Sequence, residues 1–423
     1  MITHQLKFKL SLVSLVVLSS TSTLATAKGQ AEIEQLRQEV QALRAMIEQQ
    51  QVQNVETSKA VTALATAPVV AAPASVPKLK SGASFNIYGN VRADASYQVK
   101  GGTASRIYNQ ISTVPLDGGN EGKEIFRSTL SATRLGMDVK HELNGEEISG
   151  KIETDFLGGA GLDVLRIRHA YVNYGDWLVG QTWSNFAVPD YMPESIDALG
   201  FVGGAVKRTV QARYTQNFNP STALVVAVED PKDGSSKMRI PALTARLNHE
   251  FNEDGRVSLR LMGNEKRTQE DEDVAWGVGL GLQYNLTPST TLKADYYHVK
   301  GDASFVSWAN PGFSKNEQNE ILDQNEFDSI TIGVTQQFNQ QWRGTLGYGY
   351  MKADLSDQYL AGVSATDVNK NLWQAWGNIF YSPTKPLSFG LEYVYGERKA
   401  AAALNGQDKG EDNRLNMVAI YNF

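Results

Sequence analysis

Residues 415–423 alternate strictly between two faces, and this pattern constrains the fold more than any other feature of the chain. Apolar side chains occupy one face, at Leu415, Met417, Ala419, Tyr421 and Phe423. The opposite face carries Asn416, Val418, Ile420 and Asn422. A period of two is the side-chain repeat of a β-strand, whereas an α-helix repeats every 3.6 residues. The segment therefore predicts a strand whose apolar face points outward.

The same alternation recurs from residue 85 onward. In residues 85–100, Ile87, Val91 and Tyr97 share one face, whereas Arg92 and Asp94 belong to the other. Residues 243–251 and 387–395 repeat the pattern. About sixteen such segments can be distinguished, which predicts an all-β fold.

The connections between these segments alternate in length. Tight turns rich in Gly, Asn, Asp, Pro and Ser occur at 143–146, 174–176, 218–221, 252–255, 286–289, 338–340 and 382–386. Longer polar stretches lie between most of them, at 101–130, 184–208, 302–325, 356–370 and 400–411. Short periplasmic turns and long external loops are typical of a transmembrane β-barrel. We therefore predict a 16-stranded antiparallel transmembrane β-barrel over residues 83–423, because a soluble sandwich or propeller gives no reason for this division of loop lengths.

The apolar face of the predicted strands suits contact with lipid. Trp276 and Tyr284 share one face of a single strand, and their separation is about 20 Å for a strand tilted by roughly 40°. That is close to the height of an apolar band between two aromatic girdles. The mean hydropathy of −0.33 is compatible with this interpretation, because a barrel needs apolar residues only at alternate positions.

Three segments precede the predicted barrel. Residues 1–27 combine Lys7 and Lys9 with an apolar stretch and a small-residue exit, which predicts a signal peptide. Residues 31–55 set apolar side chains at heptad spacing, which predicts a short periplasmic coiled-coil helix, with a single amphipathic helix as the alternative. Residues 56–82, rich in Ala and Pro, predict a semi-extended linker.

Basic residues predominate on the polar face of the predicted strands, although the whole chain has a net charge of −6. If the apolar faces meet lipid, the candidate pore-lining residues are Arg92, Arg134, Arg166, Arg168, Arg213, Arg246 and Arg260. Lys293 and Arg343 follow the same phase. Arginine suits carboxylates because its planar guanidinium binds them in a bidentate manner and stays charged. The alternative is that lumenal Arg and Asp only pair with each other, as for Arg92 beside Asp94.

The long segment 184–208 follows the fifth predicted strand. Its turn formers and its apolar residues, such as Phe186 and Tyr191, predict an ordered loop that folds into the barrel and narrows it. Its acids Asp190, Glu194 and Asp197 would then face the arginines and set up a transverse field across the pore. A mobile surface loop is the alternative.

The order of these segments, with RIRHAYV at 166–172 and GQTWS at 180–184, resembles the DcaP-like porin family over nearly the whole chain. The resemblance implies a homotrimer in the outer membrane, in contact with lipid and lipopolysaccharide. It also implies passive uptake of small organic anions, such as dicarboxylates or aromatic carboxylates, with Arg166 and Arg168 at the constriction. This sequence departs from a purely basic pore lining, because Asp and Glu residues are interspersed on the same face of the predicted strands.

Other functional classes find little support in the sequence. Gly277, Gly279 and Gly281 alternate inside a strand and are no phosphate-binding loop, and the five histidines lack ligand spacing. We therefore expect no enzyme, cofactor, metal site or nucleic-acid partner. The remaining alternatives are a non-selective porin, a trimeric adhesin, and a structural protein that tethers the outer membrane to peptidoglycan.

Overall fold

The computed structural model describes residues 82–104, 107–159 and 163–423. The predicted signal peptide, the coiled coil and nearly all of the linker lie outside the described residues. Among the helices that are described, none is long and apolar enough to cross a membrane.

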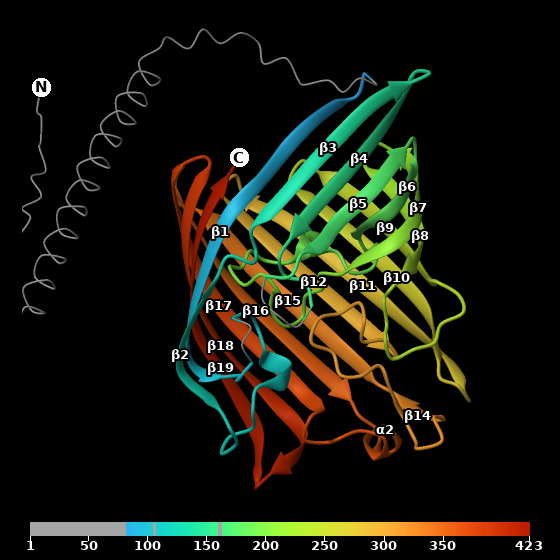
Figure 1. Cartoon of the computed structure of the whole chain (residues 1–423), viewed down its shortest axis with the longest axis vertical. Helices are drawn as coiled ribbons and strands as arrows, with labels where there is room; N and C mark the ends of the chain where they lie inside the picture. Colours follow the sequence, from blue (N-terminus) through green and yellow to red (C-terminus); the bar gives the residue numbers. More distant parts are fainter. Residues whose placement is uncertain (1–81, 105–106, 160–162) are drawn as a thin grey trace, which may run out of the picture. The chain divides into compact units, whose positions relative to one another are not determined.

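The described chain forms a closed antiparallel β-barrel (Figure 1). Its strands are β1 (Ser84–Gly101), β2 (Gly122–Thr129), β3 (Arg134–Leu143), β4 (Glu146–Asp155), β5 (Arg166–Tyr174), β6 (Trp177–Trp183), β7 (Arg208–Asn219), β8 (Thr222–Asp230), β9 (Ala242–Asn252), β10 (Gly255–Arg267), β11 (Glu272–Thr287), β12 (Thr290–Lys300), β15 (Glu326–Gln337), β16 (Trp342–Asp354), β17 (Asn369–Thr384), β18 (Leu387–Leu404) and β19 (Gln407–Asn422). Two short strands, β13 (Phe313–Lys315) and β14 (Ile321–Gln324), form a separate hairpin, and α2 (Asp357–Ala361) lies in a loop.

The number of barrel strands is sixteen, as predicted, because β2 and β3 share one position beside β1. β2 pairs with one half of β1, from Asp94 to Gly101, and β3 pairs with the other half, from Ser84 to Asn90. β1 also pairs with β19, which closes the barrel. At the seam, Gly89 N donates to Phe423 O at 3.1 Å and Phe423 N donates to Gly89 O at 3.0 Å.

The predicted strand phase is confirmed on the walls. Ile87 and Val91 expose more than half of their surface on the outer face, whereas Asp94 and Ser96 of the same strand are buried in the interior. On β19, Tyr421 is exposed while Asn416 and Val418 are buried. The apolar side chains therefore form the outer belt that a membrane barrel requires.

The two ends of the barrel differ as the loop lengths predicted, with two exceptions, of which the first is that residues 122–129 of the predicted loop 101–130 form the wall strand β2. The tight turns gather at the end where β1 begins, which we name the short-turn end, and the longer connections gather at the long-loop end, with α2 and β14 (Figure 1). The prediction of a long loop at 400–411 is wrong, because β18 and β19 join through Asn405 and Gly406 alone. Both residues have positive φ, 53° and 81°, which is the backbone of a two-residue hairpin turn.

Described parts of three long-loop segments fold back into the barrel and pack together; the segments are 102–121, 184–207 and 301–325. One or two residues from each segment are almost completely buried in a single apolar cluster, namely Ile111, Val114, Phe186, Val202 and Phe305. The 3-10 helices η1 (Ile111–Thr113) and η2 (Pro189–Tyr191) belong to the first two segments. The hydrophobic core of this barrel thus lies inside its lumen.

The inward loops cover one part of the inner wall and leave another part open. The inward side chains Ser329, Thr331, Thr345, Gln374 and Glu392, from β15 to β18, are at most 2% exposed. Four inward arginines on β3, β7, β9 and β10 remain partly exposed, namely Arg134, Arg213, Arg246 and Arg256. The open part of the lumen therefore lies along the wall from β3 to β10.

Candidate functional site

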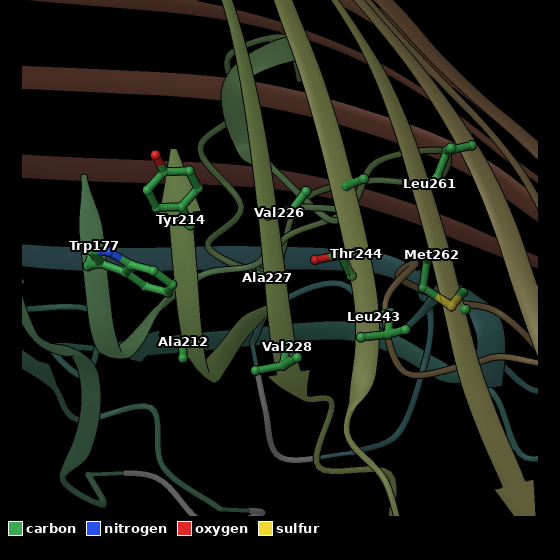
Figure 2. A pocket seen from close by; sticks show the side chains of 12 residues that line it. Trp177, Ala212, Tyr214, Val226, Ala227, Val228, Leu243, Thr244, Leu261 and Met262 are labelled. Carbon is green, nitrogen blue, oxygen red and sulfur yellow. The ribbon is translucent and has the colours of Figure 1, made fainter. Parts of the chain in front are cut away.

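A large hollow occurs on the outer face of the barrel, outside the lumen (Figure 2). It has a volume of about 640 Å³ and is lined by apolar side chains of β6 to β10, including Trp177, Tyr214, Leu243 and Leu261. These residues belong to the belt that faces lipid. We therefore place the candidate site in the lumen, between the loop at 184–207 and the open wall.

The loop begins at a buried carboxylate. Glu229 of β8, 1% exposed, accepts hydrogen bonds from the backbone N–H of Asn185 at 2.8 Å and from the hydroxyls of Thr209 at 2.8 Å and Thr244 at 2.6 Å. A buried carboxylate is tolerated when its oxygens are satisfied in this way. Glu229 thus fixes the point at which the loop leaves β6 and turns inward.

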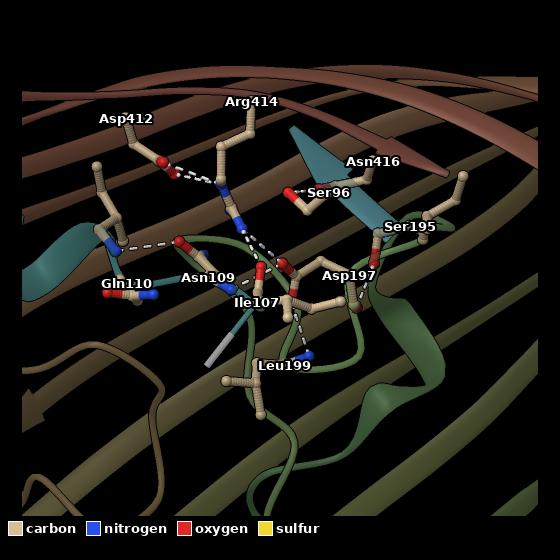
Figure 3. A network of polar contacts seen from close by, with 12 residues as sticks. Ser96, Ile107, Asn109, Gln110, Ser195, Asp197, Leu199, Asp412, Arg414 and Asn416 are labelled. Atoms are coloured by element: carbon tan, nitrogen blue, oxygen red, sulfur yellow. Dashed lines mark hydrogen bonds and ion pairs between the residues drawn. The ribbon is translucent and has the colours of Figure 1, made fainter. Parts of the chain in front are cut away.

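The middle of the loop is bonded to the opposite wall. Glu392 of β18 accepts hydrogen bonds from the backbone N–H groups of Ile196 at 2.8 Å and Asp197 at 3.3 Å. The carboxylate of Asp197 accepts from Asn109 N at 2.7 Å and from Arg414 Nη1 at 3.2 Å (Figure 3). Burial raises the pKa of Asp197, and Arg414 and the backbone donors only partly offset this effect. The loop at 184–207 is therefore held across the lumen on both sides.

The segment at 102–121 belongs to the same network. Asn109 donates to Gln374 Oε1 of β17 at 2.7 Å, and Gln374 Nε2 donates to Asp412 of β19 at 3.0 Å. Asp412 also pairs with Arg414 at 2.9 Å. Sequence reasoning did not predict this inward segment, although the aromatic Tyr108 and the aliphatic Ile111 and Val114 in a polar stretch were a signal for it.

The three acids predicted for the constriction loop have different surroundings. Glu194 forms a bidentate pair with Arg343 of β16, at 2.8–3.1 Å, and Asp197 is buried against Arg414. Asp190 is partly exposed, and its Oδ2 atom lies 3.7 Å from Arg246 Nη1. Among the three, only Asp190 is therefore left to face the open wall.

Four of the seven predicted arginines are tied to carboxylates of the wall, and three of these four lie on β1 and β5. Arg92 pairs with Asp94 at 2.6 Å and donates to Ile196 O of the loop at 2.5 Å. Arg166 pairs with Asp155 at 2.7 Å, and Arg168 pairs with both Glu153 at 2.6 Å and Asp155 at 3.0 Å. These pairs correspond to the alternative interpretation, in which lumenal charges neutralise one another.

Arg260 does not reach the open lumen. Its side chain is fully buried under the loop, where it donates to Phe186 O at 3.2 Å and Tyr297 Oη at 2.5 Å and pairs with Asp295. It therefore supports the loop and is no part of the pore surface that the sequence predicted.

The remaining predicted arginines keep their charge available. Within the described ranges, Arg134 and Arg213 have no carboxylate at ion-pair distance, and Arg246 has only the contact with Asp190. Three further cations, which have no acid partner among the described residues, accompany them: Arg208, Arg256 and Lys293. Arg208 lies over the ring of Trp183, 4.4 Å from its centroid. Arg256 was missed in the sequence, although it shares the inward phase of Arg260.

These cations fall into two groups by their electrostatic neighbours. Arg134 and Arg208 interact with Arg168, which defines an outer cluster of Arg134, Arg166, Arg168 and Arg208. Arg246 interacts with Arg213 and Arg256, and Lys293 with Arg256, which defines an inner cluster of Arg213, Arg246, Arg256 and Lys293. Glu153 and Asp155 offset part of the outer charge, and Asp190 offsets part of the inner charge. Both clusters therefore carry more positive than negative groups.

Metal binding has no visible basis in this part of the protein. Residues 82–104, 107–159 and 163–423 contain no group of three or more His, Asp or Glu side chains that could hold a metal ion. The lumen instead contains a set of fixed guanidinium donors along a wall that faces water, and this arrangement suits the reversible binding of anions.

Comparisons with known proteins agree with this geometry. A family model described as DcaP outer membrane protein matches residues 20–423. The outer membrane channel DcaP of Acinetobacter baumannii is 34% identical with a TM-score of 0.75, and the match covers 82% of this chain and 100% of that one. A search of curated proteins found no match.

Two more distant structures show the fold alone. The anion-selective porin from Comamonas acidovorans is 12% identical with a TM-score of 0.54, over 81% of this chain and 100% of that one. The trimer form of OmpT from Vibrio cholerae is 14% identical with a TM-score of 0.51, over 81% of this chain and 99% of that one.

Proposed function

Because the chain belongs to the DcaP outer membrane protein family, we propose that this outer-membrane channel admits small organic anions by passive diffusion. Its solutes are dicarboxylates and aromatic carboxylates. The proposal rests on the cations of the open wall that have no carboxylate partner in the part of the chain that the structure describes, namely Arg134, Arg208, Arg213, Arg256 and Lys293. Arg246, which contacts only Asp190 there, accompanies them.

The charge balance of the open lumen supports anion selectivity. Glu194 and Asp197 are paired with Arg343 and Arg414, so that they do not offset the cations of the facing wall. A row of guanidinium groups in a narrow passage attracts anions and repels cations. Arg92, Arg166 and Arg168, which pair with acids, add less to this selectivity than the unpaired cations.

The chemistry of the outer cluster favours carboxylates as solutes. Guanidinium groups bind carboxylates through parallel hydrogen bonds and thereby replace part of their hydration. Trp183, over which Arg208 lies, adds an aromatic ring to the surroundings of this cluster, which would suit an aromatic carboxylate. Binding must stay weak for transport, because a solute that enters must also leave.

The proposed assembly is a homotrimer embedded in outer-membrane lipid and lipopolysaccharide. The trimer form of OmpT, which shares the fold, supports it. The periplasmic coiled coil at 31–55 stays a prediction. If that helix contacts peptidoglycan, the barrel is an envelope anchor. Deleting residues 31–55 and measuring solute uptake separately from envelope integrity distinguishes the two functions.

Planar-bilayer measurements test the proposed selectivity. In a KCl gradient the reversal potential of the wild-type channel should have the sign of an anion-selective pore. Substituting Arg134→Gln should move it toward zero, whereas Arg267→Gln, at the long-loop end of β10, should leave it unchanged. A cation-selective wild-type channel refutes the proposal, and a reversal potential near zero favours the non-selective porin.

A further inference from the structure

A pocket lies in the lumen beside η2, near the short-turn end of β7 to β10. Its volume is about 290 Å³. The loop contributes Asp190 and Tyr191, and the wall contributes Arg246 of β9 and Arg256 of β10. The other inward lining residues are short or uncharged, among them Asn217, Ala223 and Asn248, except for Glu250 near the turn between β9 and β10. Short side chains around two arginines leave room for a small ligand.

The two arginines of this pocket have unused hydrogen-bond donors. Arg256 Nη2 donates to Gln283 Oε1 at 2.8 Å, and its guanidinium lies 5.8 Å from the ring centroid of Tyr191. The Nε atoms of Arg246 and Arg256 are buried and have no partner within the described residues. A guanidinium carries five N–H donors, so most donors of this pair are not satisfied by the protein.

Asp190 is close to Arg246 but does not bind it fully. The distance of 3.7 Å between Asp190 Oδ2 and Arg246 Nη1 is too long for a hydrogen bond. The Asp190 side chain is also 41% exposed. Its charge therefore weakens the attraction of Arg246 for other anions while leaving the donors of Arg246 open.

We propose that this pocket is an inner anion site that holds a carboxylate group of the solute between Arg246 and Arg256, with Asp190 as a tethered competitor. The inference deepens the proposed function and rests on it. A solute passes from the outer cluster to the inner site, and two weak sites in series allow conduction where one tight site would trap the solute. Glu250, exposed near the turn between β9 and β10, lines the same pocket, and its negative charge keeps the binding weak enough for the solute to leave.

The test is the block of ion current by succinate in planar bilayers that contain the full-length channel. Arg256→Gln removes one of the two cations and should raise the dissociation constant of succinate, added from the short-turn side, about tenfold. Asp190→Asn removes the competitor and should lower it about fivefold. Arg267→Gln, which removes the same charge from the same strand away from the pocket, should leave the constant unchanged.

Opposite shifts for the two substitutions distinguish a site from a general loss of charge. Equal block in Arg256→Gln and Arg267→Gln overturns the inner site, and so does weaker block in Asp190→Asn. Arg246→Gln is the second variant should Arg256→Gln fail to fold. The reversal potential of the same channels separates the two proposals: a cation-selective wild type refutes the proposed function, whereas an anion-selective channel with unchanged block in Arg256→Gln refutes only the inner site.

Discussion

The lumenal arginines of this barrel differ in what surrounds them. Arg168, with 7% of its side chain exposed, is enclosed by Glu153 and Asp155 in a group of four charges that also includes Arg166. Arg213 has no such partner among residues 82–104, 107–159 and 163–423 and keeps part of its surface open. Removing a buried partner leaves uncompensated charge behind, whereas removing an unpaired cation does not.

This difference predicts that two similar substitutions affect different properties, one the stability of the barrel and the other its ion selectivity. Arg168→Gln should destabilise the barrel by about 3 kcal/mol, because Glu153 loses its ion-pair partner and Asp155 keeps only Arg166. Arg213→Gln should leave stability nearly unchanged and lower the anion-to-cation permeability ratio about threefold. Urea unfolding followed by gel mobility gives the first value, and reversal potentials give the second. Equal effects of both substitutions on stability would contradict the distinction.

The direction of each arginine was predictable from the sequence, but its partner was not. The alternation along each strand predicted that Arg92, Arg134 and Arg213 point inward. The neighbouring Asp94 already suggested the ion pair with Arg92. The partners of Arg166 and Arg168 lie on β4, and they meet only through the register between β4 and β5. Register depends on turn geometry and on a bulge beside Glu153, which a single sequence does not specify.

Among the elements, the loop at 184–207 depends on a row of glycines in β11. Gly277, Gly279 and Gly281 face the lumen, and a Cβ atom at Gly281 would overlap the ring of Tyr191. At Gly277 an added Cβ would come within 2.8 Å of Phe186. Because these glycines have no side chains, the loop packs directly against the backbone of β11, and we name this contact surface the seat of the loop.

Adding one methyl group to this seat should move the loop. Gly281→Ala should push Tyr191 toward the open wall, lower the single-channel conductance and reduce stability by about 1–3 kcal/mol through overpacking. Gly263→Ala on the adjacent strand is the control, because a Cβ there meets nothing within 4 Å. Conductance and thermal unfolding should therefore change in the first variant only, and unchanged conductance in Gly281→Ala would show that the loop does not border the passage.

The elements themselves were more predictable than their packing. Period two and turn residues indicated the strands and the barrel, because these signals are local. The break between β2 and β3 and the inward course of residues 102–121 and 301–325 were not foreseen. Their packing combines residues far apart in the chain, such as Ile111 with Phe305, and no local pattern records it.

For the whole molecule, a buried charge network joins the long-loop connections. Lys266 of β10 bonds to Asp233 in the connection 231–241 and to Asp302 in the segment 301–325, each at 2.5 Å. Burial raises the pKa of Asp233, but Lys266 and the hydrogen bonds of Ser235 outweigh this effect, so the pKa lies below its ordinary value. The charged carboxylate is therefore the form that the folded protein prefers.

The lowered pKa sets the direction of a pH effect. The stabilising contribution of Asp233 is complete above the ordinary pKa of Asp, about 3.9, and is lost as the pH falls through the lowered value. Hydrogen exchange of residues 231–241, corrected for the intrinsic rate, should thus accelerate only in strong acid. Asp233→Asn should remove this acid-dependent step, and its persistence in that variant would assign the step to another group.

The division of the lumen between packed loops and an open wall also bears on how this channel can change over evolutionary time. Inward side chains from β15 to β18 are committed to folding, whereas a second set on the facing wall, Arg134, Arg213, Arg246 and Arg256, stays partly exposed to the lumen. Substitutions in the second set can change which solutes enter the channel without destabilising the barrel. Diversification of substrate preference among related sequences should therefore be concentrated on one side of the wall.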